Sequence, residues 1–394
     1  MTPSAARSML PALSPDEQRH SEAVAALIRA ELAAGGGWLS FERFMELALY
    51  APGLGYYRAG SWKLGSGGDF VTAPEVSELF GCCLAGQCAE ILRATGGQIL
   101  ELGAGSGSLA AALLCALDAA GVLPERYAIL EVSGDLAARQ RARLAALPPH
   151  LRERIVWLER LPPAPLRGVI LANEVADALP VRRFRLRGGA ACELGVALAP
   201  GGTLEVAERP PDAELAQACA AIFGALPLAL PDGYTSEVNL RVAPWIASLG
   251  DCLERGVVLL IDYGLPRAHY YHAQRAAGTL RCHFRQRAHD DPFVNLGVQD
   301  ITAWVDFTRV AEAASLAGLE VSGFTTQAAF LLALGLERVV AAAPDTASRA
   351  RLAGEARRLL MPEEMGEAFK VMALTRACET PLTGFRVQDL RRSL

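Results

Sequence analysis

A glycine-rich turn between a predicted strand and a predicted helix constrains this chain most. Residues 97–109 read Gly-Gln-Ile-Leu-Glu-Leu-Gly-Ala-Gly-Ser-Gly-Ser-Leu, so a short apolar strand runs into Glu101. Three glycines follow at alternate positions, namely Gly103, Gly105 and Gly107. Glycine lets the backbone approach a ligand closely and adopt dihedral angles that a side chain would forbid. A helix rich in Ala and Leu follows, so the stretch predicts a strand–turn–helix unit that binds a nucleotide-like ligand.

The spacing of these glycines argues against a dinucleotide. A dinucleotide fingerprint reads Gly-x-Gly-x-x-Gly directly after the strand, whereas Ser108 stands where its third glycine would be. Glu101 would repel a pyrophosphate and suits a cationic or zwitterionic ligand. The order acid-x-Gly-x-Gly-x-Gly resembles motif I of the class I S-adenosyl-L-methionine (SAM) methyltransferases, whose cofactor carries a sulfonium and an amino-acid tail but no phosphate. A glycine-rich turn without a ligand is the alternative.

Composition excludes several classes of protein. The chain has 394 residues, of which 52% are hydrophobic and 21% charged, as is typical of globular proteins. Its formal net charge of −5 gives no overall attraction for nucleic acid. Nine cysteines without a Cys-x-x-Cys pair predict reduced thiols, with neither a disulfide framework nor a metal site. Without a uniformly apolar segment of about 18 residues or a secretory leader, we expect a cytoplasmic protein that does not insert into a membrane.

Strands and helices alternate in the centre of the chain. We expect strands at 98–102, 126–131, 154–158, 168–173 and 256–262, with helices at 107–120, 134–146 and directly after 174. This alternation predicts an α/β fold with a mostly parallel sheet and helices on both faces. Glycine pairs at 188–189 and 201–202 predict antiparallel hairpins, and a helix is expected at 212–224. Towards the end we expect a helix at 300–317 and strands at 319–325 and 369–376.

Polar residues follow four of the predicted strands. Ligands of parallel α/β sheets bind beyond the carboxyl ends of the strands, and those ends carry Glu101, Glu131, Asn173-Glu174 and Asp262. An acid at the position of Glu131 can accept hydrogen bonds from both hydroxyls of a ribose. A helix cap or a solvated edge is the alternative for each residue alone, but the four together indicate a binding site.

Asn173, Glu174 and Asp177 are the candidates for catalysis. Glu174 and Asp177 are three residues apart, so a helical turn would place both carboxylates on one face. Beside a sulfonium donor the pair would hold a cationic nitrogen of the substrate, and it would clamp a guanidinium bidentately. Because a guanidinium is a weak acid, we expect positioning to matter more than base catalysis. Capping of a helix by Asn173 or Asp177 is the alternative.

We expect four regions along the chain. Residues 1–95 form an N-terminal helical cap with a cofactor-covering loop, in which Thr72-Ala73-Pro74-Glu75 has the pattern of a capping box before a long helix. The catalytic core comprises 96–180 and 256–378, and 181–255 form an inserted hairpin and helix region for the substrate. Residues 379–394 form a tail. The basic run at 281–291 is expected to be either a solvated loop or a loop that covers the substrate.

Several motifs in fixed order resemble one family. They comprise Gly68-Asp69-Phe70-Val71-Thr72-Ala73-Pro74-Glu75-Val76-Ser77, the Glu101 motif, Asn173-Glu174 with Asp177-Ala178-Leu179-Pro180-Val181, Ile261-Asp262-Tyr263-Gly264 and Gly278-Thr279-Leu280-Arg281-Cys282, followed by 289–292, 299–300 and 305–307. Over roughly residues 38–376 they resemble the MidA-like methyltransferases, which include the mitochondrial complex I assembly-factor arginine methyltransferase. Ala176 is a small departure, because a larger apolar residue is common there.

The resemblance implies an activity and further site residues. It implies a class I SAM methyltransferase fold, SAM as cofactor with S-adenosyl-homocysteine (SAH) as product, and symmetric dimethylation of a protein arginine. The segment 68–77 would fold over the cofactor, with Asp69 and Thr72 lining the pocket. We expect a protein substrate, no nucleic acid and a possible homodimer. The alternatives are a SAM-binding assembly or scaffold protein without turnover, and a methyltransferase for small molecules.

Overall fold

The chain forms two compact units, and each is built from three separate segments. The computed structural model describes residues 10–59 and 72–394. The first unit comprises Met1–Phe70, Asp177–Val242 and Pro266–Asp306, and the second comprises Val71–Ala176, Ala243–Leu265 and Phe307–Leu394. The helix at 78–95 and residues 243–252 belong to the second unit, whereas residues 266–306 belong to the first. The four regions expected from sequence group these segments differently and stay a prediction.

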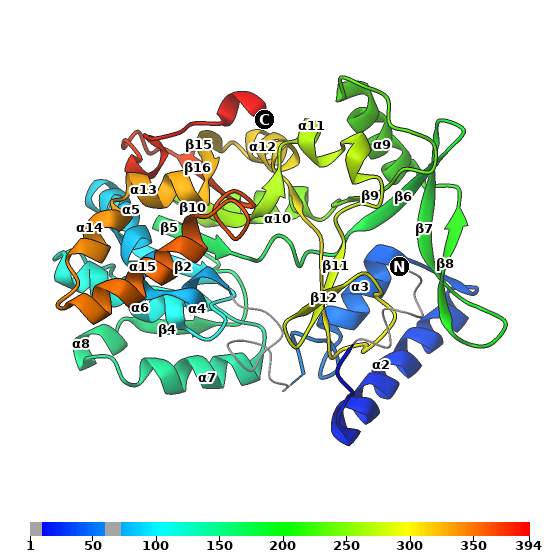
Figure 1. The fold of residues 1–394 in the computed structure, drawn as a ribbon, viewed down its shortest axis with the longest axis horizontal. Helices are drawn as coiled ribbons and strands as arrows, with labels where there is room; N and C mark the ends of the chain where they lie inside the picture. The colour runs from blue at the N-terminus through cyan, green and yellow to red at the C-terminus, as the bar shows by residue number, and fades with distance from the viewer. Residues whose placement is uncertain (1–9, 60–71) are drawn as a thin grey trace. The chain divides into compact units, whose positions relative to one another are not determined.

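The second unit contains the mostly parallel sheet (Figure 1). Along the sheet the strands run β4 (Ile155–Leu158), β3 (Tyr127–Leu130), β2 (Gln98–Leu102), β5 (Leu166–Asn173), β10 (Leu253–Leu265), β16 (Phe369–Arg376) and β15 (Glu320–Thr326). The strands from β4 to β10 are parallel to one another, whereas β16 is antiparallel to both of its neighbours. The carboxyl ends of β2, β3, β5 and β10 therefore lie along one edge of the sheet.

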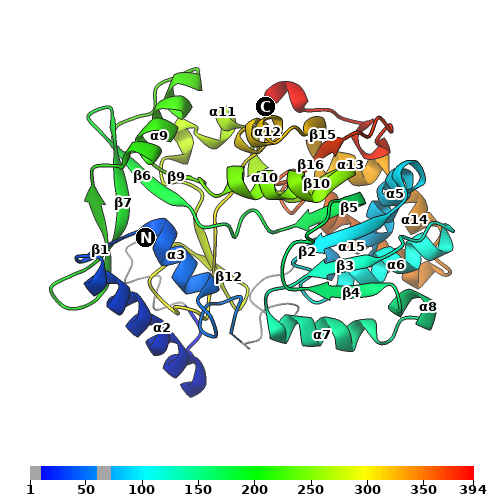
Figure 2. The ribbon, with the colours of Figure 1, turned by 180° about the vertical axis from the view of Figure 1, so that it is seen from behind.

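Burial on both faces explains the long apolar runs in these strands. Val169 and Leu171 of β5 share a core cluster with α5 (Glu78–Thr95) and α6 (Ser108–Ala119), and the alternate residue Ile170 is fully buried as well. Side chains alternate between the two faces of a strand, so both faces of β5 are covered. Figures 1 and 2 show the helices that flank the sheet. They include α7 (Gly134–Leu144), α10 (Val242–Cys252), α12 (Phe307–Leu316), α13 (Gln327–Ala333), α14 (Leu336–Ala341) and α15 (Thr346–Leu360).

The first unit contains antiparallel sheets. One sheet has the order β1 (Trp38–Ser40), β7 (Ala190–Leu198), β6 (Arg182–Arg187) and β9 (Thr235–Val238), with β8 (Leu204–Arg209) also paired to β7. The smaller sheet has the order β12 (Arg287–His289), β11 (Arg281–Phe284) and β13 (Asp300–Thr302). The helices of the first unit include α2 (Pro15–Ala34), α3 (Phe41–Tyr50) and α9 (Ala213–Ala225). The predicted hairpin at Gly188-Gly189 is confirmed, and both residues have positive φ, as a tight hairpin turn requires.

Several predicted elements differ from the structure. The helix expected after residue 174 is absent, since 174–180 form bends and turns and Glu174 has a φ of 54°. The helix expected from 300 begins only at Phe307, because residues 300–302 pair with β11. The basic run at 281–291, expected to be a loop, is largely a β-ribbon, in which Arg285 and Gln286 turn between β11 and β12.

The helix expected after Thr72 is interrupted. Ser77 has extended dihedral angles of −162° and 143°, so the segment forms the short α4 (Ala73–Val76) followed by α5. Thr72 makes no side-chain capping bond, whereas Ser77 caps α5 by accepting a hydrogen bond from the Leu79 N–H. The expected capping box at Thr72 is therefore wrong, and the side chain of Glu75 makes other contacts.

Candidate functional site

The glycine loop after β2 has the backbone that its sequence predicts. Gly103, Gly105 and Gly107 have φ of 60°, 55° and 84°, in the left-handed region that favours glycine. Gly107 precedes α6 directly, in a left-handed conformation. A Cβ on Gly103 or Gly107 would meet only ordinary contacts of 3.6 and 3.5 Å within the protein. Conformation rather than crowding therefore requires these glycines, and their bare backbone leaves room for a ligand.

Glu101 is a buried acid near the carboxyl end of β2. The residue is 3% exposed, and its carboxyl group accepts a hydrogen bond of 2.7 Å from the hydroxyl of Tyr127. Burial raises the pKa of Glu101 to about 7, against the lowering effect of the Tyr127 hydrogen bond. A positive charge brought against this carboxylate would favour its ionised form. The site is thus suited to a ligand that carries an ammonium group.

Glu131 follows β3 and is oriented by two hydrogen bonds. Its Oε1 accepts from the N–H of Ser133 at 2.9 Å, and its Oε2 accepts from Nε2 of Gln140 at 2.9 Å. The same Gln140 amide donates to the carbonyl of Gly105 at 3.0 Å and accepts from Nε1 of Trp157 at 3.0 Å. Gln140 therefore joins the acid after β3 to the glycine loop after β2. A carboxylate oriented in this way is suited to accept hydrogen bonds from the hydroxyls of a ribose.

Asn173 and Glu174 occupy a strained corner at the end of β5. Glu174 has a φ of 54°, and such left-handed backbone at a residue other than glycine costs about 1–3 kcal/mol. Its N–H donates to the carbonyl of Ile261 at 2.9 Å, and its Oε1 accepts from Nδ2 of Asn173 at 3.2 Å. The corner is fixed further by Asp262, which accepts from the Ala176 N–H at 3.0 Å. Strain maintained in this way at a carboxyl edge points to function.

The structure brings most of the predicted site residues to one edge of the second unit. They are Glu101, Gly103, Gly105, Gly107, Glu131, Asn173 and Glu174. Thr72 precedes α4 in the same unit, and Asp69 lies outside the described residues. Asp177 is buried in the first unit, where its carbonyl accepts from the Ala303 N–H at 3.0 Å. Because no helix follows residue 174, a helical turn does not align Glu174 with Asp177.

Two functional candidates at this edge escaped the sequence analysis. Gln140 contacts Gly105 and Glu131, and Glu75 contacts the serines of the glycine loop. Gln140 lies inside α7 and Glu75 fits a capping box, so neither carries a sequence pattern that marks a tertiary contact. Only the fold, which brings α4 and α7 to this loop, reveals their roles.

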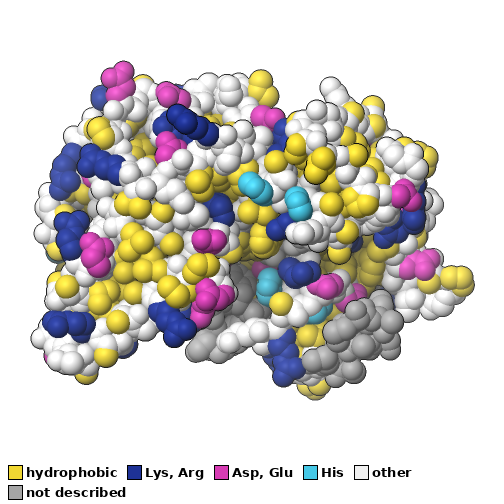
Figure 3. Space-filling view, turned by 45° about the horizontal axis from the view of Figure 1, so that its top comes forward, with side chains coloured by type: hydrophobic (Ala, Val, Ile, Leu, Met, Phe, Trp, Pro, Cys, Tyr) yellow, Lys and Arg dark blue, Asp and Glu magenta, His cyan; other side chains and the backbone are white. Residues whose placement is uncertain are grey.

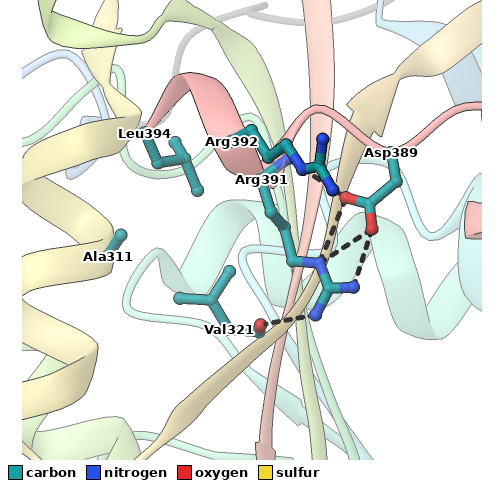
Figure 4. Close-up of a pocket in the computed structure, with 6 residues that line it drawn as sticks. All are labelled: Ala311, Val321, Asp389, Arg391, Arg392 and Leu394. Carbon is teal, nitrogen blue, oxygen red and sulfur yellow. Dashed lines mark hydrogen bonds and ion pairs between the residues drawn. The ribbon is translucent and has the colours of Figure 1, made fainter.

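A separate groove of about 550 Å³ opens elsewhere in the second unit (Figure 4). It is lined by Ala311, Val321, Asp389, Arg391, Arg392 and Leu394. Val321 lies near the amino end of β15, away from the carboxyl edge that carries the predicted site. The guanidinium of Arg391 is bound by the carboxylate of Asp389, with contacts of 2.7 to 3.1 Å. This neutralised pair gives no reason to place the chemistry here.

The surface carries no large field of one sign on the face drawn in Figure 3. Basic and acidic side chains are interspersed there. Within residues 10–59 and 72–394, no helix is long and apolar enough to cross a membrane. In the same part of the chain, no group of three or more His, Cys, Asp or Glu side chains could hold a metal ion.

Comparison with known proteins identifies the family. Residues 83–325 match the family described as S-adenosyl-L-methionine-dependent methyltransferases. The chain belongs to this family. A crystal structure of a methyltransferase-like protein from Burkholderia thailandensis bound to SAH is 44% identical, with a TM-score of 0.92, over 98% of this chain and 100% of that chain. The predicted class I SAM methyltransferase fold is thereby confirmed, and so is SAM as the cofactor of this methyltransferase.

Curated relatives are similar over most of the chain. The mitochondrial protein arginine methyltransferase NDUFAF7 homologue of Drosophila melanogaster is 30% identical over 88% of this chain and 83% of its own length. NDUFAF7 of Danio rerio is 29% identical over 86% of this chain and 83% of its own length. These similarities do not favour a scaffold without turnover. The expected cytoplasmic location is wrong on this comparison, since these relatives are named as mitochondrial proteins.

Proposed function

We propose that this methyltransferase transfers the methyl group of SAM to a guanidinium nitrogen of an arginine in a protein. One observation carries the proposal: the backbone of Glu174 is strained, and its carboxylate lies at the edge of the sheet that also carries the glycine loop. A carboxylate is the natural partner of a guanidinium, because the two form parallel hydrogen bonds. The names of the curated relatives, which are protein arginine methyltransferases, support the same substrate class.

The residues of the second unit fit the cofactor. The bare backbone of the glycine loop would let SAM approach closely. Glu131 would accept hydrogen bonds from the ribose hydroxyls of SAM, and Glu101 would face the ammonium of its amino-acid tail. The geometry that supports these assignments is the left-handed backbone at Gly103, Gly105 and Gly107, the orientation of Glu131 by Gln140 and the burial of Glu101. The family resemblance adds Asp69 and Thr72 to this pocket. When bound, SAM supplies a methyl group already activated by its sulfonium.

Glu174 would act on the acceptor mainly by positioning. Asn173 donates to Oε1 of Glu174 at 3.2 Å and so restrains the carboxylate. A guanidinium bound to that carboxylate would have its charge drawn away from the attacking nitrogen, which would be aligned with the methyl group. As the N–CH₃ bond forms and the S–CH₃ bond breaks, the acceptor loses one proton, which Glu174 would receive and pass to water. A role for Asp177 as a second carboxylate of this kind stays a prediction from the sequence, because Asp177 is buried in the first unit.

Substitution of Glu174 tests the proposal. Glu174→Gln keeps the shape of the side chain but removes its charge, so kcat should fall by about 100-fold or more while SAH binds as tightly as before. The assay follows labelled methyl groups from SAM into the proteins of a cell extract, with hydrolysis to identify methylated arginine. Glu254→Gln, at the exposed Glu254–Arg167 ion pair near the start of β10, is the matched control and should retain full turnover.

Two results would contradict the assignment. Unchanged turnover in Glu174→Gln would remove Glu174 from the acceptor site. Label found in another amino acid, or only in small molecules, would exclude arginine as the acceptor.

A further inference from the structure

Glu75 of α4 contacts two serines of the glycine loop. Its Oε1 accepts a hydrogen bond from the hydroxyl of Ser108 at 2.7 Å and another from the hydroxyl of Ser106. Ser106 lies between Gly105 and Gly107, and Ser108 begins α6. The two hydroxyls are themselves 2.8 Å apart, so the three side chains form one connected group. A single carboxylate oxygen thus accepts hydrogen bonds from the residues that precede and follow Gly107.

Charge and partial burial strengthen this group. The side chain of Glu75 is 15% exposed, and hydrogen bonds to an ionised acceptor are about twice as strong as those between neutral groups. Nη1 of Arg143, from α7, donates to the Ser106 hydroxyl at 3.1 Å and lies 4.0 Å from Oε1 of Glu75. Ser106 is therefore restrained by an anion on one side and by a cation on the other.

A second contact places α4 at the carboxyl edge of the sheet. The N–H of Ala73, at the start of α4, donates to Oε1 of Glu174 at 3.4 Å. The helix also packs against α5, α6 and α15. Because Thr72 makes no capping bond and Glu75 contacts the loop after β2, the segment is fixed by tertiary contacts. A four-residue helix without such contacts would not be stable alone.

We propose that Glu75 is a positioning residue of the cofactor site. By accepting from Ser106 and Ser108, it holds the glycine loop in the conformation that receives SAM. Glycines give this loop many accessible conformations, so a ligand must order the loop unless another group has already done so. Glu75 orders the loop before the cofactor binds and so reduces the entropy that binding must overcome. The inference rests on the proposed placement of SAM at the glycine loop.

Calorimetric titration with SAH tests this role. Glu75→Ala should weaken SAH binding by about tenfold and raise the KM for SAM equally, with kcat at saturating SAM within about twofold of wild type. Glu75→Gln should restore most of the affinity, since its amide oxygen still accepts from both serines. The double variant Ser106→Ala/Ser108→Ala removes the same bonds from the other side. It should reproduce the loss, and adding Glu75→Ala to it should cause little further change.

A matched control separates this role from general stability. Ser77, directly after α4, donates to Oε2 of Glu355 at 2.6 Å. Glu355→Ala therefore also removes the carboxylate partner of a serine beside α4, but it leaves the contacts of Glu75 with the glycine loop in place. Glu355→Ala should bind SAH like wild type. If Glu75→Ala and the serine variant also bind like wild type, while Gly103→Val weakens binding, the role of Glu75 is overturned. If Gly103→Val binds normally too, the placement of the cofactor is wrong and the inference falls with it.

Discussion

Glu101 illustrates how one buried residue prepares the site for a cation. Its pKa of about 7 means that a large part of the protein carries the neutral acid near neutral pH. A cofactor ammonium favours the carboxylate, so binding below pH 7 requires the loss of a proton. Each pH unit below the pKa adds about 1.4 kcal/mol to the cost of ionisation. Cofactor affinity and protonation of this residue are therefore linked.

The linkage predicts opposite effects of pH on binding and on stability. SAH binding should tighten as pH rises from 5.5 to 7, by up to about tenfold per unit, and calorimetry in buffers of different ionisation enthalpy should detect proton release. Because the folded pKa lies above the unfolded value of 4.5, the free energy of unfolding of the free protein should fall as pH rises from 4.5 towards 7. Glu101→Gln should lose both effects. A pH-independent affinity in the wild type would contradict the assignment of Glu101 to the cofactor.

At the scale of elements, a row of glycines joins three strands near their amino ends. An added Cβ on Gly168 of β5 would lie 2.1 Å from the carbonyl oxygen of Gln98, and one on Gly256 of β10 would lie 1.9 Å from that of Gly168. Gly97 meets the carbonyl of Arg167 in the same way, at 2.2 Å. These contacts involve backbone atoms, which cannot give way as a flexible side chain would. The row thus sets how closely β2, β5 and β10 approach at the end opposite the site.

Substitution of Gly168 should destabilise the sheet without acting directly on the site. Gly168→Ala should lower the free energy of unfolding by about 3 kcal/mol, because it adds a backbone clash at a φ of 119°. Gly354 of α15 has open space around it, and Gly354→Ala should raise stability by about 0.5–1 kcal/mol through helix propensity. Urea titrations of both variants measure the two changes. Equal effects from the two substitutions would contradict the steric argument.

The elements that could be predicted from sequence are those with local causes. The bounds of β2 and β16 agree with prediction to the residue, because the signals that define these strands lie within the segments themselves. The left-handed backbone of the glycine loop was predictable for the same reason, since the glycines that allow it lie within the loop. The corner at Glu174 was missed because its backbone is fixed by Ile261, far along the chain. Glu75 and Gln140 were missed for the same reason, since their partners lie on other elements.

At the scale of the whole molecule, the two units have different expected roles. The chain passes between them five times, at 70/71, 176/177, 242/243, 265/266 and 306/307, so neither unit is a continuous piece of sequence. Every described residue that is proposed to hold the cofactor belongs to the second unit. The antiparallel sheet of β6, β7 and β9 belongs entirely to the first. Ligand binding should therefore affect the two units unequally.

Hydrogen exchange with and without SAH tests this division. Bound SAH should slow exchange at residues 99–110, 131–140 and 73–76, because these segments carry or adjoin the glycine loop, Glu131 and α4. The amides of β6, β7 and β9 should change little, since their hydrogen bonds are made within the first unit. NAD should protect none of these segments, as the glycine spacing lacks the dinucleotide pattern, and Gly103→Val should abolish the effect of SAH. Protection centred on β6 to β9 would instead place the cofactor in the first unit and remove the glycine loop from its proposed role.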